Sequence, residues 1–311
     1  MLIDPTTPAS GAQADLHRLL ALRFPARQLD IRRRRRALAQ LSGGQRSNFR
    51  GRGIEFEEVR GYQAGDDIRA IDWRVTARTG SAHTKMFHEE RERPVLLVVD
   101  HRPAMDFGSR YCFKSVLAAE LAALLAWSAL GSNERVGALI LRHDEHWELR
   151  PRNSRRTVLA VLSALAETRP AHPADAAQEA RFVDMLRSAR RVARPGTSVF
   201  LLSDFAGADR DDAQEEMFRL ARHTEITAIH CSDPLEQALP PAGHYAITDG
   251  VNRLDLDTAA PSLKSRYAEE SRLALEAHRE RLQRLGIPLL MARTDEAPLS
   301  LLRRLYGDGV A

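Results

Sequence analysis

The segments VLLVVD (residues 95–100) and SVFLLSDF (residues 198–205) decide the fold of this chain. Each is a short, continuous apolar run with an aspartate at or near its end, a pattern typical of a parallel strand buried on both faces. In parallel sheets, ligands bind outside the carboxyl ends of the strands, where the strand order reverses. If the two strands are neighbours, Asp100 and Asp204 lie together at that edge.

Helical and strand-like patterns alternate around these two runs. Helices are expected at residues 111–130, 155–167, 177–193, 211–222, 261–285 and 297–305, and strands at 136–142, 147–150, 224–230 and 287–292. The first two of these strands are expected to form a hairpin. The alternation predicts an α/β fold with a doubly wound, mostly parallel sheet that helices cover on both faces.

The chain before residue 94 has a different character. Helical spacing is present at residues 12–24 and 28–41, and the second stretch contains the run Arg32–Arg36. Short strands with turns are expected over residues 54–93. We therefore divide the chain into N-terminal helices with a basic loop (1–50), a short-strand segment (51–93) and the α/β domain (94–311).

Length, charge and cysteine content bound the class of protein. The chain has 311 residues and a net charge of +4, and the positive excess lies in residues 1–60, which hold 12 arginines against 6 acids. The apolar stretch 116–130 is short for a membrane span and contains Glu120. Cys112 and Cys231 are isolated and are expected to be reduced. These features favour a cytoplasmic protein.

Common motifs of enzymes and nucleotide-binding proteins are absent. Phe113 stands where a phosphate-binding loop needs its second glycine, and Phe56 stands where a dinucleotide loop needs its third. Glu92 stands where a metalloprotease motif needs histidine, and there is no nucleophile elbow. We therefore expect no cofactor and no enzymatic activity.

An ordered motif over residues 43–107 resembles the bacterial family catalogued as domain of unknown function 58. The matching residues are Gly51, Gly53, Phe56, Arg60, Tyr62, Gly65, Asp66, Asp67, Arg69, Ile71, Asp72, Trp73, Ala77, Arg78 and Glu90. The resemblance implies a domain similar to von Willebrand factor A. It also implies a partner on a separate chain, an AAA+ ATPase of the MoxR type.

Domains similar to von Willebrand factor A carry a metal-ion-dependent adhesion site, built from D-x-S-x-S, a threonine and an aspartate. Asp100 and Asp204 match its two aspartates and Met105 is kept, but Arg102 and Ala104 replace the serines. Residues 170–179 contain no threonine. Mg²⁺ needs about six oxygen ligands, so a degenerate site is expected, with Asp100 and Asp204 as residual candidates.

Two interpretations of Arg102 stay open from the sequence. Its guanidinium group either replaces the metal by pairing with Asp100 or Asp204, or it points to solvent while Asp100 caps the following segment. The segment from Arg60 to Arg78 also has two interpretations. Its alternating charges form either a structural unit with Tyr62 and Trp73 packed beneath, or a docking surface; the residues concerned are Arg60, Asp66, Asp67, Arg69, Asp72, Trp73 and Arg78.

The resemblance favours a non-enzymatic, protein-binding adaptor or co-chaperone that links the ATPase to a client protein. Its expected contact surface is the sheet edge formed by Asp100, Arg102, Met105 and Asp204, together with the Arg60–Arg78 segment. One alternative is a metal-dependent hydrolase that uses Asp100 and Asp204. Another is nucleic-acid binding through the N-terminal arginines, which we do not expect because the rest of the chain is acidic. Peripheral membrane contact stays open.

Overall fold

The structure is a computed structural model that describes residues 4–31, 55–63, 68, 71–88, 93–142, 145–167, 177–248 and 253–307. The chain divides into two compact units. The larger unit comprises Met1–Gly43 with Arg93–Ala311, and the smaller comprises Gly44–Glu92. The described residues 4–31 belong to the larger unit, and the predicted boundary at residue 50 lies outside the described residues.

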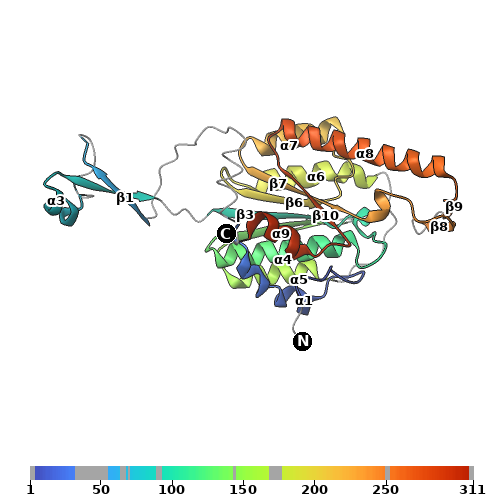
Figure 1. The fold of residues 1–311 in the computed structure, drawn as a ribbon, viewed down its shortest axis with the longest axis horizontal. Coiled ribbons are helices and arrows are strands. Elements are labelled where there is room, and N and C mark those ends of the chain that lie inside the picture. The colour runs from blue at the N-terminus through green and yellow to red at the C-terminus, as the bar shows by residue number, and fades with distance from the viewer. Residues whose placement is uncertain are drawn as a thin grey trace. The chain divides into compact units, whose positions relative to one another are not determined.

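A six-stranded sheet forms the centre of the larger unit (Figure 1). Its strands follow the order β10 (Leu289–Arg293), β7 (Glu225–Ser232), β6 (Ser198–Ser203), β3 (Pro94–Asp100), β4 (Arg135–Leu141) and β5 (His146–Arg152). Five strands are parallel, and β5 pairs antiparallel with β4 as the expected hairpin. From β3 the chain continues to β4 on one side and later to β6 on the other, so the strand order reverses at β3.

Helices cover both faces of this sheet, which confirms the predicted doubly wound α/β fold (Figure 1). One face packs against α4 (Lys114–Gly131), α5 (Arg155–Leu165) and α9 (Pro298–Tyr306), and the other against α6 (Ala177–Val192), α7 (Asp211–Ala221) and α8 (Pro261–Arg284). Within β3, Leu97 and Val99 join the first core, whereas Leu96 and Val98 join the second. This alternation explains why the strand is apolar throughout.

The central helix of the first core is α4. It is buried along nearly its whole length, including Glu120. Among the described helices it is the one long and apolar enough to cross a membrane, and 89% of it is buried inside the protein. Packing against the sheet therefore accounts for its apolar composition.

Two short N-terminal elements pack against α4: α1 (Leu16–Ala21) and the 3-10 helix η1 (Pro25–Gln28). The guanidinium group of Arg18 forms an ion pair with the buried Glu120 carboxylate. The indole nitrogen of Trp127 donates a hydrogen bond to the Leu19 carbonyl (3.1 Å). The helix expected at residues 28–41, with Arg32–Arg36, lies outside the described residues apart from its first positions.

The smaller unit contains an antiparallel pair, β1 (Glu55–Gly61) and β2 (His83–His88), with α3 (Trp73–Thr79) between them in the chain. The sequence expectation of strands alone missed α3. The Asp72 side chain caps this helix by accepting hydrogen bonds from the backbone amides of Arg74 (3.0 Å) and Val75 (3.2 Å). Gly80 ends it in the left-handed conformation (φ 74°).

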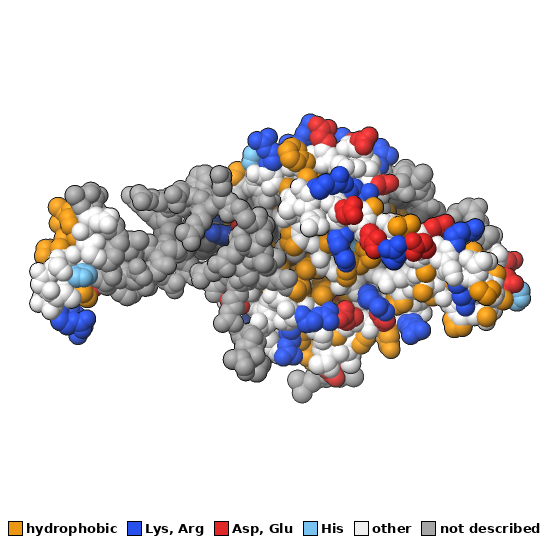
Figure 2. Space-filling view, turned by 45° about the horizontal axis from the view of Figure 1, so that its top comes forward, with side chains coloured by type: hydrophobic (Ala, Val, Ile, Leu, Met, Phe, Trp, Pro, Cys, Tyr) orange, Lys and Arg blue, Asp and Glu red, His pale blue; other side chains and the backbone are white. Residues whose placement is uncertain are grey.

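A second hairpin, β8 (His244–Thr248) with β9 (Arg253–Asp257), precedes α8 and was also not expected. On the face of the larger unit drawn in Figure 2, basic and acidic side chains lie intermixed. The many arginines of the chain are therefore largely offset by neighbouring acids on that face, as the near-balanced composition indicates.

Candidate functional site

Asp100 and Asp204 meet at the carboxyl edge of the sheet. Asp100 ends β3 and Asp204 directly follows β6, and these two strands are hydrogen-bonded neighbours. The strand order reverses at this point, which is where doubly wound sheets bind ligands. The topology therefore places the two predicted carboxylates in the position most often used for function.

Arg102 pairs with Asp100 inside the protein. Its Nε lies 3.0 Å from each carboxylate oxygen of Asp100, and its Nη2 lies 2.7 Å from Oδ2. The same guanidinium donates through Nη1 to the Ala206 carbonyl (3.0 Å). Both side chains are fully buried. This bidentate pairing agrees with the first interpretation of Arg102, in which it takes the place of a metal.

The remaining capacity of the Asp100 carboxylate is filled by local donors. The backbone amide of Arg102 donates to Oδ1 (2.9 Å), and the Ser203 hydroxyl donates to Oδ2 (2.6 Å). The guanidinium carbon of Arg102 also lies 5.3 Å from the centre of the Phe182 ring, a cation–π contact. Side chains and backbone groups of this chain therefore already bind both oxygens of the Asp100 carboxylate.

Lys114 pairs with Asp204, and the sequence patterns did not predict a role for this lysine. Its ammonium lies 2.9 Å from Asp204 Oδ2 and 2.6 Å from Glu236 Oε1. Lys114 is the first residue of α4 and is buried. One signal was available in the sequence: it is one of only three lysines in an arginine-rich chain, and it begins an otherwise apolar helix.

The opposite charges in this group shift one another's pKa values so that each charged form is favoured. Burial alone would raise the pKa of Asp204, but the cations of Lys114 and Arg102 outweigh it and hold that pKa below its ordinary value. Burial opposes the charged form of Lys114, yet the carboxylates of Asp204 and Glu236 raise its pKa. The pairing therefore favours the charged forms of both Asp204 and Lys114.

These residues do not fit a divalent cation. Both oxygens of Asp100 accept hydrogen bonds from Arg102, and Asp204 accepts from Lys114 and from the Ala206 amide (3.0 Å). Two fixed cations would repel the metal, and the short hydroxyl ligands are missing at Arg102 and Ala104. Within the described ranges, no cluster of three or more His, Cys, Asp or Glu side chains could hold a metal ion. The loop expected to supply a threonine lies largely outside those ranges.

The loop at 106–113 forms an exposed rim beside this group. Phe107 and Tyr111 are 39% and 52% exposed. The loop is tied down by a hydrogen bond from the Ser109 amide to Asp233 (2.9 Å) and one from the Gly11 amide to the Tyr111 carbonyl (2.8 Å). A Cβ on Gly108 would lie 1.9 Å from the Cys112 carbonyl oxygen, so the close approach requires glycine.

The structure places the other candidate residues in different surroundings. Met105 is buried in the core, within the 3-10 helix η3 (Pro103–Met105). In the smaller unit, Asp72 is a helix cap, Arg78 is exposed, and Trp73 is 67% exposed, so the expectation that Trp73 packs beneath this segment is not met. Asp66, Asp67, Arg69 and the Arg60 side chain lie outside the described parts of the chain.

Two mycobacterial proteins are similar to this chain in sequence. Two curated relatives, the uncharacterized proteins Mb1516 of Mycobacterium bovis and Rv1480 of Mycobacterium tuberculosis, are each 34% identical over 254 residues, covering 79% of this chain and 76% of theirs.

Solved structures similar to the chain include BatB from Bacteroides thetaiotaomicron (TM-score 0.35, 13% identity, 62% of this chain and 98% of that chain). They also include the SpRpn10 VWA domain (TM-score 0.38, 11% identity, 71% and 100%). The larger unit contains the doubly wound, mostly parallel sheet that the sequence predicted. A family model described as protein of unknown function DUF58 matches residues 58–279. The chain belongs to this family.

Proposed function

We propose that this chain is a non-enzymatic, cytoplasmic protein-binding module that works as an adaptor or co-chaperone with an AAA+ ATPase of the MoxR type. Family membership and the α/β fold support a role in protein interaction. The observation that carries the proposal is the self-neutralised group at the switch point. There Arg102 and Lys114 hold the two aspartates that a metal would bridge in an adhesion site.

The self-neutralised group defines a degenerate adhesion site. An adhesion-site metal leaves one position for a carboxylate of the partner protein, and here no such position is offered. Asp100, Arg102 and Met105 are buried, so direct contact falls to the rim loop, where Phe107 and Tyr111 are exposed. Aromatic side chains are enriched at protein interfaces. The buried charges then fix the rim loop in position, and the rim binds the partner.

The hydrolase alternative has less support from the geometry. A metal-activating carboxylate needs free lone pairs, and those of Asp100 are occupied by Arg102 and Ser203. For nucleic-acid binding, the run Arg32–Arg36 lies outside the described residues, so the structure adds nothing in its favour.

Co-purification with the MoxR-type ATPase of the same organism tests the proposed partner. Both full chains are expressed together, and capture is measured with ATP, with ADP and without nucleotide. We expect the two chains to be captured together at a 1:1 ratio in a nucleotide-dependent way. The amount of ATPase captured should fall at least tenfold in the double variant Phe107→Ala, Tyr111→Ala. The matched control is Phe218→Ala, an aromatic residue on α7 that is 51% exposed. Equal capture of both variants, or no capture of the ATPase at all, would refute the proposal.

Calorimetry with Mg²⁺ and Mn²⁺ tests the degenerate site separately. The chelator-treated protein should show no saturable one-site binding. Replacing Arg102 and Ala104 by serine restores two ligands, but Lys114 still occupies Asp204. We therefore expect a gain of binding only when Lys114→Thr is added. A saturable isotherm of the unmodified protein that is lost on Asp100→Ala would overturn this part of the proposal.

A further inference from the structure

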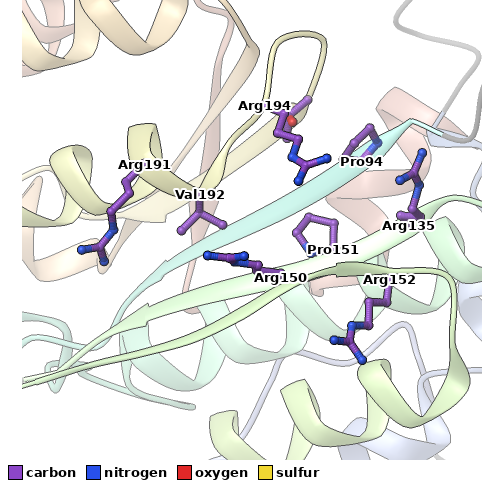
Figure 3. Close-up of a pocket in the computed structure, with 9 residues that line it drawn as sticks. Pro94, Arg135, Arg150, Pro151, Arg152, Arg191, Val192 and Arg194 are labelled. Atoms are coloured by element: carbon purple, nitrogen blue, oxygen red, sulfur yellow. The ribbon is translucent and has the colours of Figure 1, made fainter.

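A second concave site lies at the amino ends of the strands, at the opposite edge of the sheet from Asp100. It is a cleft of about 350 Å³ lined by the start of β3, β4 and β6, the end of β5 and the end of α6. Figure 3 shows the side chains around it. Five of the lining residues are arginines: Arg135, Arg150, Arg152, Arg191 and Arg194.

The charge of this cleft is one-sided. Among the residues that the structure describes, neither an acidic nor an aromatic side chain lines it. Arg191 is engaged with Glu148 on β5 (3.2 Å). The side chains of Arg150, Arg152 and Arg194 make no hydrogen bond or ion pair within the part of the chain that the structure describes. The cleft therefore differs from the mixed surface of Figure 2, because three of its five arginine side chains have no acidic partner among the described residues.

A distortion of the edge strand builds the wall of the cleft. Val136 pairs with Arg152 and Ala138 pairs with Leu149, so Arg150 and Pro151 together lie opposite Gly137 as a β-bulge. A Cβ on Gly137 would lie 2.5 Å from the Leu149 carbonyl oxygen and 2.6 Å from the Pro151 nitrogen. Bulges re-aim side chains and are enriched beside functional sites. In Figure 3, Pro151 lies between the side chains of Arg150 and Arg194.

An independent feature of the cleft is a buried hydroxyl that has no partner. Thr197 lines the cleft just before β6 and is 1% exposed. Its Oγ1 makes no hydrogen bond to any residue that the structure describes. Buried polar atoms are normally paired, and an unpaired one destabilises the protein. A ligand that accepts a hydrogen bond from Thr197 would remove this penalty.

We propose that this cleft binds a compact, free polyphosphate-type anion that carries two or more phosphate groups. Guanidinium groups bind phosphate oxygens through paired donors, and three unpaired arginines call for several negative charges within a small volume. The volume suits a small molecule. The described lining residues include no aromatic side chain that could stack on a base, so a phosphate chain fits this lining better than a nucleotide.

The test is calorimetric titration of the full chain with sodium tripolyphosphate at constant ionic strength. We expect saturable binding of one anion per chain, weakened about tenfold or more by Arg150→Gln and by Arg194→Gln. The matched control is Arg279→Gln, an exposed arginine on α8 outside the cleft, which should change the affinity less than twofold. Equal weakening by all three variants would show general charge attraction and overturn the proposal.

A conservative change at Thr197 separates binding from folding. Thr197→Val keeps the shape of the side chain and removes the unpaired hydroxyl. The variant should melt at the same or a higher temperature than the unmodified protein, yet bind tripolyphosphate about three- to tenfold more weakly. Unchanged affinity would remove Thr197 from the site and count against the proposal. Equal binding of citrate, sulfate or a polyglutamate peptide would overturn the assignment to polyphosphate.

Discussion

Replacing Arg102 by methionine should destabilise the protein strongly, because it leaves the Asp100 charge buried without its cation. Methionine keeps most of the apolar stem but removes three donor contacts to Asp100, at 3.0, 3.0 and 2.7 Å, and one to the Ala206 carbonyl. Among the described residues, only Ser203 and the Arg102 backbone amide then remain as donors to Asp100. Breaking a buried pair from one side lowers the free energy of unfolding by about 3–5 kcal/mol.

The assay is thermal unfolding followed by circular dichroism. At about 2–4 °C per kcal/mol for a domain of this size, Arg102→Met should lower the melting temperature by roughly 6–20 °C. Arg210→Met is the matched control. Arg210 pairs with Asp212 at the same two-residue separation, with Nε 3.0 Å from Oδ1, but on the surface. Surface pairs contribute little, so the control should melt within about 1 °C of the unmodified protein.

A double variant gives the decisive comparison. Adding Asp100→Asn to Arg102→Met removes the uncompensated charge and should recover much of the lost stability, since a buried pair removed from both sides is often nearly neutral. If Arg102→Met melts within about 2 °C of the unmodified protein, or if the double variant is less stable than the single one, the reasoning about a buried ion pair is wrong.

Three further predictions follow from other buried groups. Lys114→Met should raise the pKa of Asp204, measurable by carboxyl ¹³C titration, and lower the free energy of unfolding by about 3 kcal/mol. Burial lowers the pKa of His230 and His278 to about 4. In the unfolded chain these histidines protonate near pH 6.5, so the free energy of unfolding should fall as the pH drops from 6.5 to 4. Urea unfolding should show a loss of about 2 kcal/mol per histidine at pH 5, and His278→Phe should reduce that loss. Gly137→Ala should lower the melting temperature by several degrees, through about 1–3 kcal/mol of steric strain at the β-bulge, and weaken tripolyphosphate binding.

Most of the α/β fold could be predicted because its periodic signals are strong. The continuous apolar strands β3 and β6 and the hairpin of β4 with β5 follow directly from burial on both faces and from the turn between them. The elements that were missed depend on local chemistry. The short helix α3 exists because Asp72 caps its amides and Gly80 ends it, and seven residues give too little periodicity to outweigh a strand-like context.

The candidate site could be predicted only in part. The neighbouring aspartates follow from the topology of the sheet, and the loss of the serines is visible at Arg102 and Ala104. The partner of Arg102 could not be predicted, because it depends on how deeply this side chain is buried, and hydrophobic periodicity does not indicate that. Lys114 was missed for the same reason: only the packed structure brings the first turn of α4 beside Asp204 and Glu236.

The two edges of the sheet differ in whether their charged side chains have partners. At the carboxyl end, Arg102 pairs with the buried Asp100 and Lys114 pairs with Asp204 and Glu236, so both buried cations already have carboxylate partners. At the amino end, Arg150, Arg152 and Arg194 stay without partners among the described residues, around the unpaired Thr197 hydroxyl. A charged ligand gains most where charges are not already compensated. This contrast is the reason why we propose protein contact through the rim loop at one edge and anion binding at the other.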